Sequence, residues 1–205
     1  EDFVVRAERI RGGGVDPSVD NFLKITHEAR LLGTAFTVNA PAGDNLLFHK
    51  ALDMAQPGDV IVLANKGSMS RALCGEIMSN YAKSRGIAGI IIDGCVRDSY
   101  TLSQMDFPVY AKGITPNGPY KNGPGEMNFP VSFAGIVINP GDIIVGDSDG
   151  LLAIKPDEHT AELAEIARNY HAGEEKQLEG ILTRGEWPRP WVDEALKKVG
   201  FEFVD

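Results

Sequence analysis

The sequence predicts one layered domain of the α/β class. Short β-branched runs with Pro and Gly between them fill the middle of the chain, and helical patterns lie at both ends. Size agrees, since 205 residues of which 43% are hydrophobic suffice for one sizeable core. Strands gathered in the middle with helices on either side favour a layered α/β domain over a βαβ repeat.

The first part of the chain is expected to hold two helices with a strand between them. Apolar residues recur at helical spacing between a capping Ser18 and a terminating Gly33, which predicts a helix over 18–32. A short strand, Ala35–Val38, should follow. Asn45–Ala55 is then expected to form the second helix.

Two Pro-Gly-Asp turns each precede a β-branched strand. Gln56-Pro57-Gly58-Asp59 leads into Val60–Leu63, and Asn139-Pro140-Gly141-Asp142 leads into 143–145. Pro supplies the fixed φ and Gly the positive φ of a type II turn. The likeness of the two turns is compatible with an old duplication and equally with chance.

A helix followed at once by a buried strand is predicted between these turns. The helix is expected between Arg71 and Arg85, Gly86 closes it, and the apolar run Ile90–Ile92 forms the strand. The helix face directed at the core would be formed by Ile77, Met78, Tyr81 and Ala82.

The rest of the chain reads as short strands and then a helical C-terminal region. The expected strands are Phe107–Ala111, Val131–Ile138, Asp142–Val145 and Leu151–Ile154. A charged helix is predicted from Asp157 to about Leu182, and a last helix over Trp191–Val199. Because no low-complexity linker divides the chain, residues 1–205 are predicted to form a single domain in which 157–205 is the helical C-terminal region.

Composition excludes several classes of partner. The net charge of −9 and the lack of a Lys/Arg cluster argue against nucleic-acid binding through phosphate contacts. No apolar stretch approaches the roughly 20 residues that span a bilayer, and the first residues lack the features of a secretory signal. Two cysteines, Cys74 and Cys95, are expected as thiols in a reducing compartment. We therefore expect a cytoplasmic protein with a small-molecule or protein partner, and no nucleic acid or membrane.

Arg97-Asp98 is the first candidate for a functional site, because the pair directly follows a strand that reads as buried. In α/β folds, ligands bind where such strands end. A guanidinium suits a carboxylate, and an adjacent carboxylate offers hard oxygen to Mg²⁺ or Mn²⁺. The alternative is an exposed Arg and Asp that merely open the next helix.

The start of the helix before that strand helps to decide between a ligand site and an exposed pair. If its first turn begins near Gly75, the free backbone amides of Ile77 and Met78 and the side chain of Arg97 would hold one carboxylate from two sides. Ser70 is a rival N-cap. A helix that started there would use those amides in its own hydrogen bonds and remove the anion site.

Two runs of residues resemble the RraA-like family, which includes the 4-hydroxy-4-methyl-2-oxoglutarate aldolases. They are Leu73-Cys74-Gly75-Glu76 and the segment 85–98, which ends in Arg97-Asp98. The family signature is an acidic residue or Gly, about twenty residues, and then Arg-Asp; here Glu76 precedes Arg97-Asp98 at that spacing. The segments 120–125 and 139–150 also resemble the family, so the likeness covers roughly residues 15 to 200.

The resemblance implies a fold and a metal site. The fold would be a three-layer β/β/α domain like the swivelling phosphohistidine domains, with flanking N- and C-terminal helices, assembled as a homotrimer or homohexamer. Asp98 would bind the metal directly and Glu76 through a water, with Mg²⁺ favoured and Mn²⁺ as the alternative. Arg97 would neutralise the pyruvyl group, with Gly75 and the amides of Ile77 and Met78 as further substrate contacts.

The resemblance also implies a reaction. Members are divalent-metal pyruvate aldolases that cleave a 4-hydroxy-2-oxo acid such as 4-hydroxy-4-methyl-2-oxoglutarate through a metal-stabilised enolate, and decarboxylation of oxaloacetate passes through the same enolate. In the aldolases an acidic residue lies three positions after the Asp, where this chain has Thr101. Another acidic group comes from a neighbouring subunit's C-terminal region, for which Glu174 or Glu175 is a candidate. The alternatives are an oxaloacetate decarboxylase only, or a non-catalytic RraA-type protein inhibitor of a ribonuclease.

Overall fold

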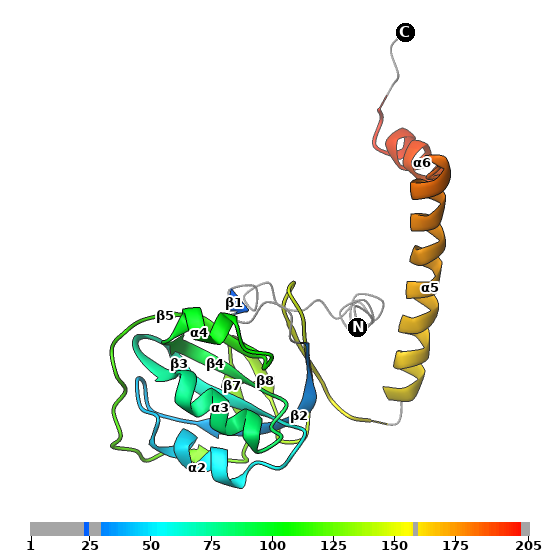
Figure 1. The fold of residues 1–205 in the computed structure, drawn as a ribbon. Coiled ribbons are helices and arrows are strands. Elements are labelled where there is room, and N and C mark those ends of the chain that lie inside the picture. The colour runs from blue at the N-terminus through cyan, green and yellow to red at the C-terminus, as the bar shows by residue number, and fades with distance from the viewer. Residues whose placement is uncertain (1–22, 25–29, 158–159, 202–205) are drawn as a thin grey trace.

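Four adjacent parallel strands form the centre of the protein (Figure 1). The computed structural model describes residues 23–24, 30–157 and 160–201. In sequence order the parallel strands are β2 (Leu31–Asn39), β3 (Asp59–Cys74), β4 (Gly89–Val96) and β5 (Val109–Ile114). They lie side by side in that order, so their carboxyl ends meet at one edge of the sheet.

Three short helices connect these strands. They are α2 (Leu46–Met54), α3 (Glu76–Ser84) and α4 (Ser99–Ser103), and all three cover the same face of the sheet in Figure 1. The expectation that the domain would not be a βαβ repeat is therefore wrong, because each pair of neighbouring parallel strands is joined through one of these helices. The repeat is hard to see in the sequence because the helices are short.

A two-stranded hairpin covers the other face. It consists of β7 (Val131–Phe133) and β8 (Ile136–Ile138), whose buried side chains pack with Val60, Val62 and Ile91 of the sheet. The segment predicted as one strand, Val131–Ile138, is thus two strands around a turn at Ala134-Gly135. Hairpin, sheet and helices make three layers with a core on each side of the sheet.

Further strands extend the sheet at both edges. β9 (Ile143–Gly146) and β10 (Leu151–Ile154) add antiparallel strands beyond β2, β6 (Glu126–Met127) pairs with β2, and β1 (Leu23–Lys24) pairs with β5. The expected strand Leu151–Ile154 is found as predicted.

The predicted helix over 18–32 is wrong wherever the structure describes it. Residues 23–24 form β1, residue 30 is outside any helix or strand, and residues 31–32 begin β2; residues 18–22 and 25–29 lie outside the described residues. Leu31 is buried in the core below the hairpin. Gly33 does not stop a helix, since a Cβ there would collide with the carbonyl oxygen of Gly58, so this strand needs the close approach that only glycine permits.

The other local predictions agree better with the structure. Asn45 and Ala55 are the caps of α2, as the predicted helix over 45–55 requires. Both Pro-Gly-Asp turns form, with φ of 90° at Gly58 and 86° at Gly141. The helix expected from Arg71 instead begins at Glu76, because residues 71–74 continue β3 alongside β4.

The face predicted for that helix is also partly wrong. Ile77 is 82% exposed and Tyr81 is exposed, whereas Ala82 is buried and Met78 packs against the core. The face turned toward the sheet is therefore narrower than the sequence suggests.

The C-terminal region consists of α5 (Thr160–Arg184) and α6 (Pro190–Lys198), which confirms the two predicted helices with small shifts of their ends. Only the start of α5 packs on the domain, through Leu163 and Ala167. The remainder projects away as an arm with α6 at its tip (Figure 1). Among the described residues, none of the helices combines the length and apolar character needed to cross a bilayer.

Candidate functional site

Arg97 and Asp98 lie at the carboxyl end of β4, where the sequence predicts a site. All eight residues of β4 are buried, and the chain becomes exposed at Arg97. Asp98 has a left-handed backbone conformation, with φ of 57° and ψ of 34°. This conformation is uncommon outside glycine, although Asp and Asn adopt it more readily than other residues. The strand thus ends in a sharp corner.

The carboxylate of Asp98 binds the start of a different helix. Asp98 is the N-cap residue of α4, but its side chain makes no capping hydrogen bond there. Instead the backbone N–H of Glu76, the first residue of α3, donates to Oδ2 of Asp98 at 3.0 Å. Nε of Arg97 lies 3.8 Å from the same oxygen, and the two side chains are 47% and 40% exposed. The negative charge therefore sits at a helix N-terminus, where it is favoured, and remains open to solvent.

Gly75 allows this contact because it has no side chain. It is the N-cap of α3 and has an extended backbone, with φ of −159° and ψ of −164°. A Cβ at this position would lie 3.0 Å from Cγ of Arg97 and closer still to Oδ2 of Asp98. The close approach of α3 to the end of β4 thus requires glycine.

The helix start decides between the two N-caps that the sequence left open. Ser70 lies in β3, so it does not cap α3. The N–H of Ser79 donates to the carbonyl of Gly75 at 3.1 Å, which makes this the first turn of the helix. The amides of Ile77 and Met78 precede that bond and have no acceptor within the helix. They are placed as an anion site at this helix end would need.

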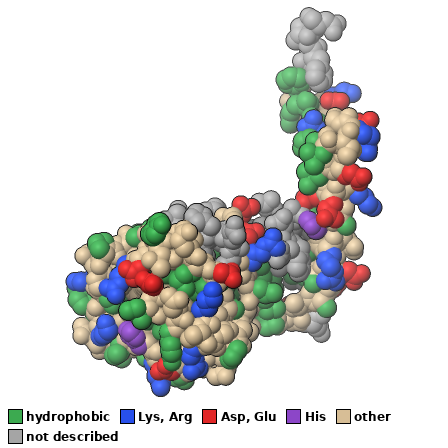
Figure 2. All heavy atoms as spheres, in the orientation of Figure 1, with side chains coloured by type: hydrophobic (Ala, Val, Ile, Leu, Met, Phe, Trp, Pro, Cys, Tyr) green, Lys and Arg blue, Asp and Glu red, His purple; other side chains and the backbone are tan. Residues whose placement is uncertain are grey.

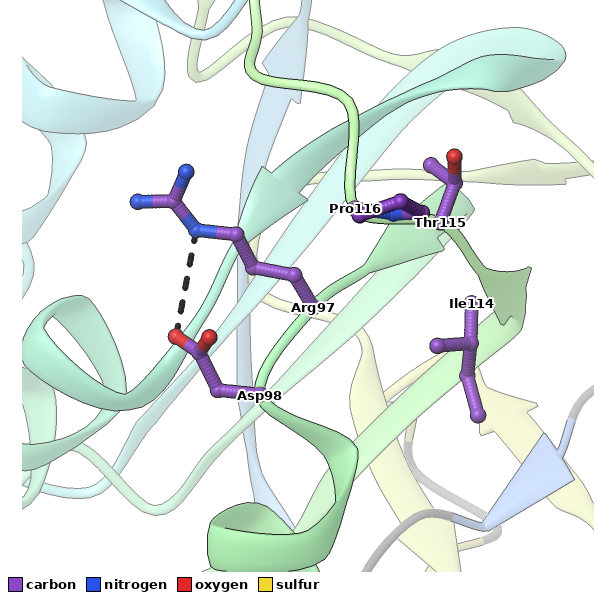
Figure 3. A pocket seen from close by; sticks show the side chains of 5 residues that line it. All are labelled: Arg97, Asp98, Ile114, Thr115 and Pro116. Atoms are coloured by element: carbon purple, nitrogen blue, oxygen red, sulfur yellow. Dashed lines mark ion pairs between the residues drawn. The ribbon is translucent and has the colours of Figure 1, made fainter.

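A cavity of about 430 Å³ adjoins these residues and is lined by Arg97, Asp98, Ile114, Thr115 and Pro116. Figure 3 shows the side chains of Arg97 and Asp98 extending to one side from the end of β4, while residues 114–116 lie opposite them. The Arg97-Asp98 pair is therefore accessible to a small ligand.

The remaining predicted residues occupy different positions relative to this pair. The backbone of Glu76 touches Asp98, but among the described residues we find no partner for the carboxylate of Glu76, which is exposed. The side chain of Ile77 points to solvent, so only its amide can contribute. Thr101 lies in α4 and is half-buried.

Arg71 is a second guanidinium beside the site that the sequence did not single out. Its Nη1 donates to the carbonyl of Gly118 at 2.9 Å, its Nη2 donates to the hydroxyl of Tyr120 at 2.8 Å, and its Cζ lies 4.2 Å from the centre of that ring. A Cβ on Gly118 would lie 4.0 Å from Nη1 of Arg97, so both guanidinium groups flank this loop. An indication of this loop was present in the sequence, because segment 120–125, which contains Tyr120, resembles the RraA-like family.

Asp44 fixes the same loop. This buried carboxylate accepts hydrogen bonds from the N–H groups of Leu46, Asn122 and Gly123, at 2.9, 2.5 and 3.0 Å. Burial acts to raise its pKa, but these backbone donors outweigh it and hold the pKa below the usual range. Asp44 is therefore an ionised anchor for the segment that carries Tyr120.

Cys74 does not offer a nucleophile at this site. It is buried, and burial raises the pKa of its thiol to about 11. Its Sγ lies 3.4 Å from Oγ of Ser79. Since the thiolate is the reactive form, the thiol is inert near neutral pH.

The site was also compared with the requirements of a metal ion. Among the residues that the structure describes, no group of three or more His, Cys, Asp or Glu side chains could enclose an ion. Asp98 offers a solvent-accessible carboxylate whose Oδ1 has no hydrogen-bond donor in the described part of the chain. Such a sparse oxygen site fits Mg²⁺, which is held by one or two carboxylates and completes its shell with water and substrate. It does not fit structural Zn²⁺.

The comparisons with known proteins cover most of the chain and agree with one another. The model of the family described as "RraA-like: Aldolase/RraA" matches residues 10–153. A protein of Halalkalibacterium halodurans named "Putative 4-hydroxy-4-methyl-2-oxoglutarate aldolase" is 34% identical over 187 residues, which cover 88% of this chain and 89% of the relative.

Two solved structures are similar as well. An uncharacterised protein of Pseudomonas syringae has a TM-score of 0.76 at 27% identity and covers 89% of this chain and 87% of its own. The RNA-processing inhibitor RraA of Thermus thermophilus has a TM-score of 0.63 at 30% identity, with 68% and 86% covered.

Proposed function

This chain belongs to the RraA-like family, and from that premise we propose that it is a divalent-metal-dependent carbon–carbon lyase that releases pyruvate from a 2-oxo acid. The proposed substrate is a 4-hydroxy-2-oxo acid such as 4-hydroxy-4-methyl-2-oxoglutarate, with oxaloacetate as a second substrate. One observation carries the proposal: the accessible carboxylate of Asp98 lies beside the guanidinium of Arg97 at a cavity of about 430 Å³.

In this proposal Asp98 binds the cation directly and Glu76 holds one of its waters. Mg²⁺ is the favoured ion and Mn²⁺ the alternative, because both accept carboxylate and water oxygens. When bound, the ion supplies a Lewis acid that withdraws charge from the 2-oxo oxygen of the substrate. Asp98 has a further task in the protein itself, since it fixes the start of α3 through the N–H of Glu76.

Arg97 and the start of α3 bind and orient the three-carbon part of the substrate. The guanidinium offers several N–H donors in one plane, which suits a carboxylate and the oxygen next to it. The amides of Ile77 and Met78 approach from the helix end. Negative charge that gathers on this fragment as the C–C bond breaks is thereby stabilised by groups already in place.

Decarboxylation of oxaloacetate is the simpler of the two reactions. Cleavage of a 4-hydroxy acid also requires a base for the proton of the 4-hydroxyl group, whereas loss of CO₂ does not. Thr101 cannot serve as that base at neutral pH because its hydroxyl is not ionised. We therefore expect oxaloacetate to be turned over even if the 4-hydroxy acid requires a carboxylate from elsewhere, such as Glu174 or Glu175 of a neighbouring copy.

The proposal is tested by pyruvate release from both substrates, measured with Mg²⁺, with Mn²⁺ and with EDTA. We expect EDTA to abolish turnover and Mg²⁺ to restore it. Asp98→Asn, which removes the charge at nearly constant volume, should lose turnover and also lose Mn²⁺ binding measured by electron paramagnetic resonance. Asp106→Asn is the matched control, because Asp106 is exposed and lies outside the cavity. Metal binding and turnover that survive Asp98→Asn would refute the assignment.

A ribonuclease inhibitor is the second candidate, favoured by the likeness to the RraA structure of Thermus thermophilus. This function needs no metal. Inhibition of a purified RNA-degrading endonuclease that is equal for the wild type and Asp98→Asn, together with no pyruvate release, would favour it over the lyase.

We further propose that the protein assembles as a homotrimer or homohexamer with the swivelling-domain type of layering. The arm of α5 and α6 supports assembly, because it exposes large apolar side chains in Leu182, Trp191 and Val199. Figure 2 shows apolar side chains along one side of the arm and charged ones along the other. Sedimentation velocity of the full chain tests this, and a monomer at all concentrations would contradict it.

A further inference from the structure

A second cavity, of about 650 Å³, lies on the hairpin side of the sheet. Each parallel strand contributes a residue: Asn39 is the last residue of β2, and Lys66, Asp93 and Lys112 lie within β3, β4 and β5. The hairpin and the residue before it supply the opposite wall through Pro130, Val131, Ser132, Ala134 and Gly135. The volume suits a small molecule.

A buried carboxylate forms one wall of this cavity. Asp93 is 4% exposed, and its Oδ2 accepts a hydrogen bond of 2.8 Å from the N–H of Gly67. Nζ of Lys112 lies 2.7 Å from Oδ1 as an ion pair. Both carboxylate oxygens of Asp93 therefore have a partner within the protein, the N–H of Gly67 and the ammonium of Lys112. Asp93 thereby holds Lys112 at the wall of the cavity.

The backbone is strained on both sides of the cavity. Lys66 has φ of 56° and Ala134 has φ of 50°, and both line it. Among the described residues only two other non-glycine residues have positive φ, and one of them is Asp98 of the candidate site. The pairing of β3 with β4 also shifts register between Leu63 and Ser68, which places Lys66 over the cavity. Strain of this kind concentrates at binding sites.

We propose that this cavity binds a small organic anion. Lys66 and Lys112 bring two positive charges and Asp93 one negative charge, so the lining has a net positive charge in a chain of net charge −9. The ammonium of Lys66 is exposed and available to the anionic group. Val131, Ala64 and Pro130 contact the apolar body of the ligand.

This site is separate from the one proposed for catalysis. Ile90 and Ile92 of β4 pack on the helix side, while Ile91 and the hairpin form the other core, to which the cavity with Asp93 belongs. Neither Arg97 nor Asp98 lines it. Ligand binding here does not depend on a metal and can be measured without one.

The probe is benzoate, titrated without metal into ¹⁵N-labelled full-length protein and followed by amide chemical shifts. An Arg97→Met background removes the guanidinium of the candidate catalytic site, which could itself bind a carboxylate. We expect the amides of Gly67, Ser132 and Gly135 to shift, and Lys66→Met to weaken the affinity about tenfold, as for the loss of a charged hydrogen bond. Lys83→Met is the control, because this exposed lysine on α3 lines neither cavity.

A neutral compound tests the role of charge. Benzyl alcohol, which lacks the carboxylate of benzoate, should not shift these amides, and equal shifts with both compounds would contradict the proposal. Lys112→Met leaves Asp93 buried without a counter-charge and is therefore used only together with Asp93→Asn. Equal affinity in Lys66→Met and Lys83→Met, or shifts confined to the start of α3, would overturn the proposal.

Discussion

Replacing Gly75 with alanine tests whether the candidate site depends on the closeness of α3 to the Arg97-Asp98 pair. The new Cβ would lie 3.0 Å from Cγ and 3.3 Å from Nε of Arg97, and nearer still to Oδ2 of Asp98. Because the extended backbone at Gly75 is open to any residue, the effect comes from space alone. Either the carboxylate leaves the N–H of Glu76 or α3 moves away from β4.

Stability and activity should respond to this change very differently. Both side chains that meet the methyl group are partly exposed and can move aside, so the free energy of unfolding should fall by only about 1 kcal/mol, the low end for overpacking. The value of kcat/KM for pyruvate release should fall about 100-fold, as expected when reacting groups shift by about 1 Å.

Urea unfolding and a coupled lactate dehydrogenase assay of pyruvate release measure the two quantities on the same preparation. Gly173→Ala in α5 is the matched control, since a Cβ there meets nothing within 4 Å. It should leave activity unchanged and favour the helix slightly. A folded Gly75→Ala protein with wild-type activity would refute the role given to this contact, as would a loss of activity that only followed a loss of folding.

Three further predictions concern charge and protonation. Since the pKa of Cys74 is raised from 9.0 to about 11, the unfolded state ionises first, and the wild type should lose roughly 2 kcal/mol of unfolding free energy relative to Cys74→Ala between pH 9 and 11 in urea titrations. Asp44→Asn should cost about 1–3 kcal/mol at pH 7. Because the pKa of Asp44 is lowered, that difference should shrink as the pH falls below about 4. Thr101→Asp should raise cleavage of the 4-hydroxy acid relative to decarboxylation about tenfold or more, measured as pyruvate from each substrate, with Ser103→Asp as control.

Each of these three has an outcome that would contradict it. Parallel pH profiles of the wild type and Cys74→Ala would mean that the thiol titrates alike in both states. A stability difference for Asp44→Asn that persists in acid would show that packing, not charge, fixes the loop. An unchanged substrate ratio in Thr101→Asp would remove residue 101 from the reaction.

Local sequence signals predicted those elements of the fold that are set by a few neighbouring residues. Both Pro-Gly-Asp turns and α2 follow from turn residues and helical spacing, and they form as expected. The failures occur where pairing with a distant strand decides the structure. Residues 71–74 fit a helical pattern, yet Ala72 and Cys74 pair with Cys95 and Val96 of β4, and this pairing prevails.

The same distinction between local and distant contacts applies to the residues of the candidate site. Arg97, Asp98 and the helix start at Gly75 could be placed from the sequence because each lies directly beside the end of an element. Arg71 could not, because its partners Gly118 and Tyr120 are more than forty positions away in the chain. The cavity around Asp93 was not foreseen either, since it requires four strands and a hairpin to come together.

The left-handed corner at Asp98 limits substitution independently of charge. A residue with a β-branched or bulky side chain would pay a conformational penalty of roughly 1–2 kcal/mol at φ of 57° before any chemistry is considered. Asparagine and glycine escape most of that penalty. A variant at this position therefore combines loss of the carboxylate with backbone strain, unless the new residue readily adopts the left-handed conformation. The substitutions that Asp98 tolerates should accordingly depend on backbone preference as well as on acidity.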